Sequence, residues 1–111
     1  MLLVMLASYS FSALAATQDE IDHLLSFVGA TDCRYDRNGT MHNGAEAVKH
    51  IIKKYHYYLD DIESTEDFIQ YSATKSNLSG KYYLVHCSNH PPVKSQDWLL
   101  KELSDFRASQ N

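Results

Sequence analysis

Cysteine is scarce in this chain, and Cys33 and Cys87 are the only two. Neither belongs to a Cys-x-x-Cys pair, the spacing that structural zinc sites use, so a cysteine-based metal site is not indicated. Two states remain open for them, a disulfide or a pair of buried free thiols. No motif for a metal ion or a cofactor is complete, and we predict neither.

A strong charge of either sign is also missing, since the formal net charge is -4 at pH 7. The densest basic run, Lys49–Lys54, is interrupted by apolar residues at helical spacing. This pattern is typical of a helix with solvated flanks rather than of a phosphate-binding stripe, so nucleic acid is not an expected partner. The loop Lys75–Lys81 is not a phosphate-binding loop either, because it has one glycine and lacks the Gly-Lys-Ser/Thr ending.

Charge is absent altogether from residues 1–16, a stretch that closes on Ala13-Leu14-Ala15. An apolar run ending on small residues is typical of a secretory leader and its cleavage site. The run is shorter than the roughly 20 apolar residues that span a bilayer. We therefore predict a cleaved leader over residues 1–15, a single domain over residues 16–111 and no stable membrane anchor. A buried N-terminal helix is the alternative. No Lys or Arg precedes Leu2, as one would in a typical leader, so either the true start lies upstream or the leader is a weak one.

Export favours a disulfide between Cys33 and Cys87, because an exported chain keeps its cysteines oxidised. A mature domain of about 95 residues builds only one small core, so a covalent link would matter to its stability. The chain-entropy model gives a loop of this length roughly 4 kcal/mol of stabilisation as an upper figure.

The rest of the chain mixes helical and extended patterns. Four segments carry apolar residues at helical spacing, and each follows a capping residue: Thr17, Asn43, Ser64 or Thr65, and Ser95. Asn38-Gly39 predicts a hairpin between short arms, and the run 82–87 predicts a third strand before Pro91-Pro92 breaks regular structure. The order predicts an α+β domain, with about four helices packed on a small, mostly antiparallel sheet of about three short strands. Leu59 and Tyr71 are among the residues expected to face the core.

The polar face of the second expected helix carries Glu46 and His50, four residues apart. A carboxylate at this spacing can orient and charge-stabilise an imidazole. His42 lies just upstream, so these three residues are the candidates for an acid–base catalytic site or for part of a zinc site. An exposed helix face with an ordinary i, i+4 pair is the alternative explanation.

Outward aromatic side chains form a second group of candidates. Tyr57 and Trp98 lie off the apolar stripes of their helices, and one of Tyr82 and Tyr83 must point away from the core because strand residues alternate. Such rings anchor sugar, peptide or protein ligands, or else they cover the rim of the core. The loop Lys75–Lys81 adds hydroxyl and amide groups. The candidate binding residues are Tyr57, Lys75, Ser76, Ser79, Tyr83 and Trp98.

Several segments together resemble a known family. They include Arg37-Asn38-Gly39, Gly44-Ala45-Glu46-Ala47, His50, Lys54-Tyr55, Phe68-Ile69, Ala73-x-Lys75-Ser76, Leu78-Ser79-Gly80, Tyr83-Leu84-Val85 with Cys87, and Trp98-Leu99. The resemblance is to small exported bacterial proteins catalogued as domain of unknown function 5329, and it covers nearly the whole mature chain. It implies an exported, periplasmic protein of a Gram-negative bacterium, and it brings no activity, cofactor or catalytic residue.

Two functions follow as expectations from different classes. The first is a small periplasmic domain that binds a protein, a peptide or a glycan without catalysis. The alternative is a small periplasmic hydrolase in which Glu46 and His50 form the acid–base pair. The two differ in geometry, because the hydrolase requires His42, Glu46 and His50 to converge in a cleft near a nucleophile or a metal.

Overall fold

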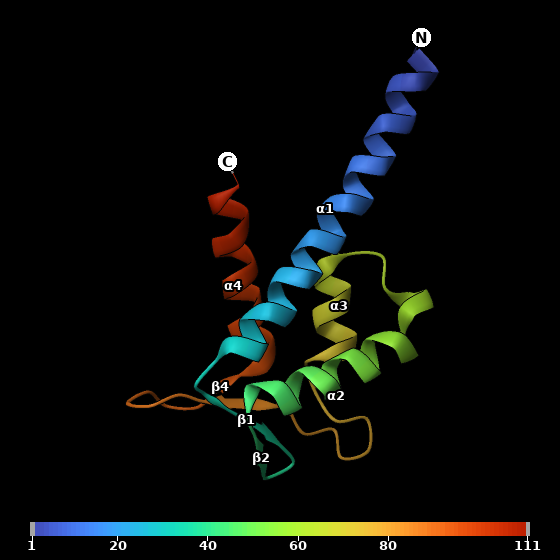
Figure 1. The fold of residues 1–111 in the computed structure, drawn as a ribbon. Helices are drawn as coiled ribbons and strands as arrows, with labels where there is room; N and C mark the ends of the chain where they lie inside the picture. The colour runs from blue at the N-terminus through green and yellow to red at the C-terminus, as the bar shows by residue number, and fades with distance from the viewer. Residues whose placement is uncertain (1, 111) are drawn as a thin grey trace.

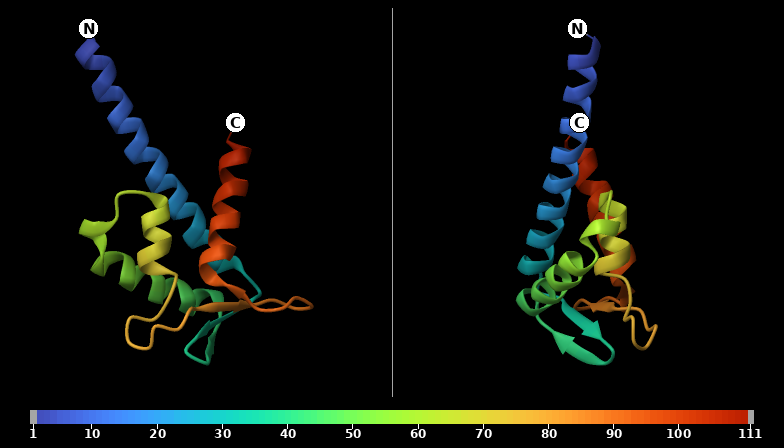
Figure 2. Two further views of the ribbon diagram at one scale, coloured as in Figure 1. Left: turned by 180° about the vertical axis from the view of Figure 1, so that it is seen from behind. Right: turned by 90° about the vertical axis from the view of Figure 1, so that its right-hand side faces the viewer.

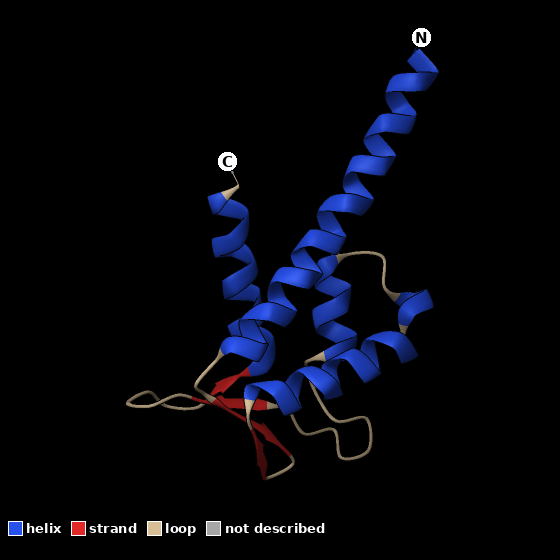
Figure 3. Cartoon of the chain, in the orientation of Figure 1, coloured by secondary structure: helices blue, strands red, loops and turns tan. Residues whose placement is uncertain are grey.

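The fold combines four helices with one small sheet. The computed structural model describes the backbone of residues 2–110 and the side chains of residues 14–110. Its helices are α1 (Leu2–Ala30), α2 (Gly44–Tyr57), α3 (Thr65–Ser72) and α4 (Ser95–Ser109), with a 3₁₀ turn at Leu59–Asp61; its strands are β1 (Arg34–Arg37), β2 (Thr40–His42), β3 (Leu84–His86) and β4 (Val93–Lys94). The sheet lies at one end of the helices, and α2 runs across the base of the others (Figures 1 and 3). The α+β prediction is confirmed, with four strands in place of about three.

The four strands pair antiparallel in the order β2-β1-β3-β4. The predicted hairpin at Asn38-Gly39 is confirmed, and both turn residues have positive φ, 56° and 88°. The strand predicted over 82–87 is shorter, because only Leu84–His86 pairs continuously with β1. The fourth strand was missed because Pro91-Pro92 indicated a break, yet Val93 directly after the prolines pairs with Val85.

Two helix starts agree with the capping residues expected from sequence. Asn43 and Glu46 form a reciprocal capping box at the start of α2, and the Ser64 side chain accepts from the Asp67 amide at the start of α3. Gly44 also allows a close approach, since a Cβ at that position would lie 2.4 Å from the carbonyl oxygen of Val28 in α1. The beginning of α2 therefore lies directly against the end of α1.

The expected start of the first helix at Thr17 is wrong. Helix α1 is continuous from Leu2 to Ala30, so Thr17 lies in its interior. The alanine-rich stretch before Thr17 favours helix and continues the element backwards. Glu20, three residues after Thr17 at the position of a capping-box glutamate, instead accepts hydrogen bonds from Thr65 of α3 and Arg107 of α4.

The expected leader corresponds to the first half of α1, which projects beyond the other helices (Figure 2). Leu14, at the base of this projection, is 71% exposed. Met1 and the side chains of residues 2–13 lie outside the described part of the chain, so the leader stays a prediction. Within residues 2–110, no helix has the length and apolar content needed to cross a bilayer.

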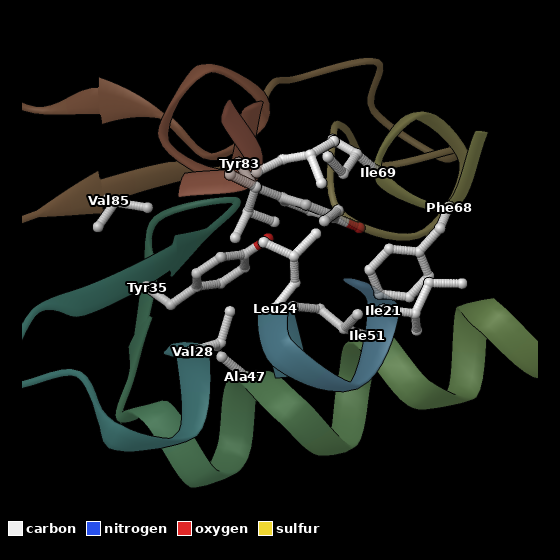
Figure 4. Close-up of a cluster of buried hydrophobic side chains, with 13 residues drawn as sticks. Ile21, Leu24, Val28, Tyr35, Ala47, Ile51, Phe68, Ile69, Tyr83 and Val85 are labelled. Atoms are coloured by element: carbon white, nitrogen blue, oxygen red, sulfur yellow. The ribbon is translucent and has the colours of Figure 1, made fainter. Parts of the chain in front are cut away.

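The core lies between α1, α2, α3, α4 and one face of the sheet (Figure 4). Among residues 14–110, its buried hydrophobic side chains are Ile21, Leu24, Val28, Tyr35, Ala47, Ile51, Phe68, Ile69, Ala73, Tyr83, Val85, Leu99 and Leu103. Tyr35 and Val85 are register partners on adjacent strands, so they cover the same face of the sheet. The helices therefore pack on one face of the sheet, as expected.

Three expectations about individual residues are wrong. Leu59 and Tyr71 are exposed, because the chain leaves α2 at Tyr57 and Tyr71 stacks on Tyr58 at the surface. Ser95 is the first residue of α4 rather than its cap, and Lys94 occupies the N-cap position. The buried Ser95 hydroxyl instead lies 2.7 Å from the hydroxyl of Tyr35, because a buried phenol needs a hydrogen-bond partner.

The predicted disulfide is present between Cys33 and Cys87, whose Cα atoms are 4.5 Å apart. Cys33 precedes β1 and Cys87 follows β3, next to the register pair Arg34 and His86. The bond therefore joins neighbouring antiparallel strands at one end of the sheet.

Replacing both cysteines, as Cys33→Ser with Cys87→Ser, should lower the free energy of unfolding. The two residues are 54 positions apart, and the loss expected from loop entropy is about 4 kcal/mol as an upper figure. Chemical denaturation of the variant and of the oxidised wild-type chain measures the difference. Reduced wild-type chain is the control and should match the variant; equal stability of oxidised and reduced chains would contradict the prediction.

Three helices are joined by one polar cluster outside the core. Arg107 of α4 forms ion pairs with Glu20 of α1 at 2.8 Å and Glu66 of α3 at 2.9 Å. Hydrogen bonds from Arg107 lower the pKa of both carboxyl groups. This stabilisation is present above the pKa of the unfolded carboxyls and is lost as the pH falls through the lower folded-state values.

Arg107→Gln should therefore destabilise the chain by about 1 kcal/mol at neutral pH, since the pairs are partly exposed. It should also reduce the acid-induced loss of stability below about pH 5. Denaturation curves between pH 3 and pH 7 measure both effects. Lys101→Gln is the matched control, because it removes only the exposed pair with Asp105 on the same helix; an equal effect of both variants would argue against the three-helix cluster.

Candidate functional site

One cleft collects several of the residues singled out from the sequence. It has a volume of about 520 Å³ and lies along the outer side of α2. We call it the α2 cleft, and its lining residues are His50, Lys53, Lys54, His56, Tyr57, Tyr58 and Asn77. Tyr57 is 81% exposed on its rim, as the helical spacing predicted. The side-chain amide of Asn77 donates to the Tyr58 hydroxyl and connects the loop after α3 to the helix.

Tyr83 lies beneath this cleft rather than on the surface. The outward orientation expected for it is wrong, because its side chain is only 3% exposed, whereas Tyr82 is the exposed member of the pair. Tyr83 lies two residues before Val85, so both side chains point to the face of the sheet that packs on the core. Its hydroxyl lies 3.4 Å from Lys54 Nζ, which donates to it, and 3.4 Å from His50 Nε2.

His50 is held in its neutral form by its surroundings. Burial lowers its pKa most, and the positive potential of Arg37, Lys54, His42 and Lys53 lowers it further, to about 4. The imidazole also meets the Tyr83 ring edge-on, with centroids 5.8 Å apart. At neutral pH, His50 therefore presents one N–H donor and one acceptor nitrogen without a charge.

The loop Lys75–Lys81 is ordered by its own hydrogen bonds. The Ser76 hydroxyl is buried and accepts from the amides of Leu78 and Ser79. The Ser79 hydroxyl donates to the Asn38 side chain, which connects the loop to the β1–β2 turn. The exposed Lys75 accepts at its carbonyl oxygen from Lys54 Nζ, at 2.8 Å. The loop therefore forms one side of the cleft region, but Ser76 is used internally rather than presented to a ligand.

The acid–base candidates are not joined into a catalytic set. The Glu46 carboxylate accepts from the Asn43 amide in the capping box, and no hydrogen bond connects it with His50 in residues 14–110. His42 lies on β2 and acts on His50 only through its charge. The hydroxyl group within hydrogen-bonding distance of His50 belongs to Tyr83, and not to a serine or threonine that could act as a nucleophile. Groups of three or more His, Cys, Asp or Glu with metal-binding geometry do not occur among the described residues.

Trp98 belongs to a different cavity, of about 540 Å³, between the end of α1, the β3–β4 hairpin and α4. Its indole packs against Phe27 with ring centroids 4.6 Å apart. The charged residues on the rim, Lys101 and Glu102, already pair with Asp105 and His23. The structure therefore does not bring Trp98 together with Tyr57 and the Lys75–Lys81 loop.

Several cleft residues were not singled out as a site from the sequence. Lys53 and Lys54 belong to the run Lys49–Lys54, which is typical of a helix with solvated flanks, and His56 and Tyr58 follow at the end of α2. The signal was present, since lysines and tyrosines at spacings of three and four residues share one side of a helix. Arg37 is different, because only the packing of β1 against α2 places it near His50.

A family model described as a family of unknown function (DUF5329) matches residues 15–107. The curated proteins and the solved structures contain no match to this chain.

The imidazole of His50 should titrate with a pKa of about 4. Because the unfolded value is near 6.5, the unfolded chain binds the proton more tightly, and His50 lowers stability as the pH falls from 6.5 to 4. Nitrogen-detected NMR of the histidine rings measures the titration, and His50→Gln assigns the resonance. The variant should also lose less stability than the wild type over this pH range. A titration of His50 near 6.5 would contradict the buried, cation-surrounded environment.

Proposed function

This chain belongs to the DUF5329 family of unknown function, and we propose that it is a non-enzymatic binding domain that holds a saccharide in the α2 cleft. The observation that carries the proposal is the convergence of the exposed Tyr57 ring, the half-buried Tyr58 ring, amine and imidazole groups and a loop amide on one cleft. A small number of directed polar groups beside aromatic surface is the usual composition of a ligand site.

The rings and the free donors have complementary roles in this proposal. Tyr57 offers an exposed ring on the rim, and such a ring can cover the apolar face of a sugar. The side chains of Lys53 and His56 make no hydrogen bond within the described part of the chain, so their donors are available to hydroxyl oxygens of a ligand. Both lie on α2, whose backbone is already hydrogen bonded, so the recognition comes from side chains.

The position of the cleft favours a saccharide over an extended peptide. A peptide that binds as an added strand pairs its backbone with the exposed edge of a sheet. The α2 cleft lies on a helix and a loop, and its lining residues include no strand residue. Stacking and side-chain hydrogen bonds therefore remain as the means of recognition.

The same proposal places the domain outside the cytoplasm, in the periplasm of a Gram-negative bacterium. The Cys33–Cys87 disulfide supports an oxidising compartment. The uncharged stretch over residues 1–16 supports export, and the family match begins at residue 15 and so leaves out nearly all of this stretch.

A glycan array probed with the disulfide-bonded chain tests the function. We expect binding to a subset of glycans, and we expect Tyr57→Ala to weaken it about tenfold, since an aromatic stacking contact contributes about 1 kcal/mol or more. Tyr82→Ala is the matched control, because Tyr82 is an exposed tyrosine outside the cleft. Binding to peptides instead of glycans, or equal losses in both variants, would overturn the proposal.

A further inference from the structure

Three basic or imidazole side chains from separate parts of the fold surround the buried Tyr83. The Arg37 guanidinium from β1 lies 5.8 Å from the centre of the Tyr83 ring, and Lys54 Nζ from α2 lies 5.1 Å from it. His50 approaches the ring edge. With Lys53 on the cleft wall, they form what we call the basic cluster: Arg37, His50, Lys53 and Lys54.

No carboxylate of the described residues forms an ion pair with Arg37, Lys53 or Lys54. This differs from the paired Arg107 and Lys101 on α4. Ion pairs are rare among the described residues, since only Lys101 and Arg107 of the 10 Lys and Arg residues pair with a carboxylate. What distinguishes Arg37 and Lys54 from the other unpaired cations is their position, because both lie over the ring of the buried Tyr83.

The acidic side chains on the same elements are engaged elsewhere. Asp36 alternates with Arg37 along β1, so it lies on the other face of the sheet, where it contacts His86 and the Gly39 amide. Glu46 accepts from Asn43 at the start of α2. Neither carboxylate is used to neutralise the basic cluster.

The cluster also holds unused hydrogen-bonding capacity. Arg37 Nε is buried and has no hydrogen-bond partner among residues 14–110. A buried donor without a partner and a group of like charges at partial burial both cost stability. A bound anion would remove both costs, because it accepts hydrogen bonds and supplies the missing negative charge.

We propose that the basic cluster binds an oxyanion group of the ligand, so that the saccharide of the α2 cleft is an acidic one, carrying a carboxylate, phosphate or sulfate. The inference rests on the proposed function of this cleft. Arg37 and Lys54 supply charged donors, and the neutral His50 and the Tyr83 hydroxyl supply uncharged ones. Tyr57 on the rim then contacts the sugar ring of the same ligand.

Calorimetric titration of the full disulfide-bonded chain with D-glucose, D-glucuronate, glucose 6-phosphate and inorganic phosphate, at matched ionic strength, tests the inference. We expect the two acidic sugars to bind at least about tenfold more tightly than glucose. Arg37→Gln and Lys54→Gln should each weaken the acidic sugars about tenfold. Arg37→Gln should leave glucose binding unchanged, because Arg37 does not line the cleft.

Two matched controls remove the same charges outside the cluster. Arg34→Gln is on the same strand but on the opposite face, and Lys49→Gln is on α2 but does not line the cleft. Both should bind like the wild type, and thermal unfolding of every variant without ligand checks that it folds. If a control variant weakened the binding of the acidic sugars as much as its cluster counterpart, the effect would come from the net charge of the protein, and the inference would be overturned.

The outcomes separate this inference from the function on which it rests. If glucose and glucuronate bind equally well, the oxyanion site is wrong and the saccharide cleft stands. If inorganic phosphate binds as tightly as the acidic sugars, the oxyanion site stands and saccharide recognition is wrong. If none of the four compounds binds, and the glycan array is also blank, both proposals are overturned.

Discussion

The burial of Tyr83 is the constraint on which both the core and the cleft depend. Its ring packs with Tyr35 in the core, at a centroid separation of 5.9 Å, while its hydroxyl reaches Lys54 and His50 on α2. A tyrosine can connect the two because its body is apolar and its tip is polar. This core side chain therefore also contacts His50 and Lys54, which line the cleft, so the two regions cannot be repacked independently.

Two groups of charged side chains in this fold differ in how well positive and negative charges are matched. Around Arg107, cation and carboxylates are matched and connect α1, α3 and α4. Around Tyr83, cations gather without carboxylates, and burial together with these cations lowers the pKa of His50. A stabilising function explains the first group. The second costs stability unless something outside the chain compensates it, and strain of this kind is more typical of binding sites than of structural ones.

The sequence predicts a feature correctly where the interaction that determines it joins residues close together in the chain. The Asn43 capping box, the Ser64 cap and the Asn38-Gly39 turn are decided within four residues, and all three were predicted correctly. Ser95 satisfied the same local rule, yet its hydroxyl went to Tyr35, sixty positions away. The sequence does indicate which of Tyr82 and Tyr83 is buried. Apolar Val85 and polar His86 show which alternate positions of the strand face the core, and Tyr83 shares the side of Val85.

The sequence by itself determined the class of the fold, the disulfide partners and the basic and aromatic side of α2. These follow from short-range periodicity, from the presence of only two cysteines and from the residue types four positions apart. Only the tertiary structure decided that Arg37 joins α2 around Tyr83 and that Trp98 lies in a separate cavity. The reason is physical: spacing along a chain gives the side of an element, whereas packing decides which sides meet and which charges stay unpaired.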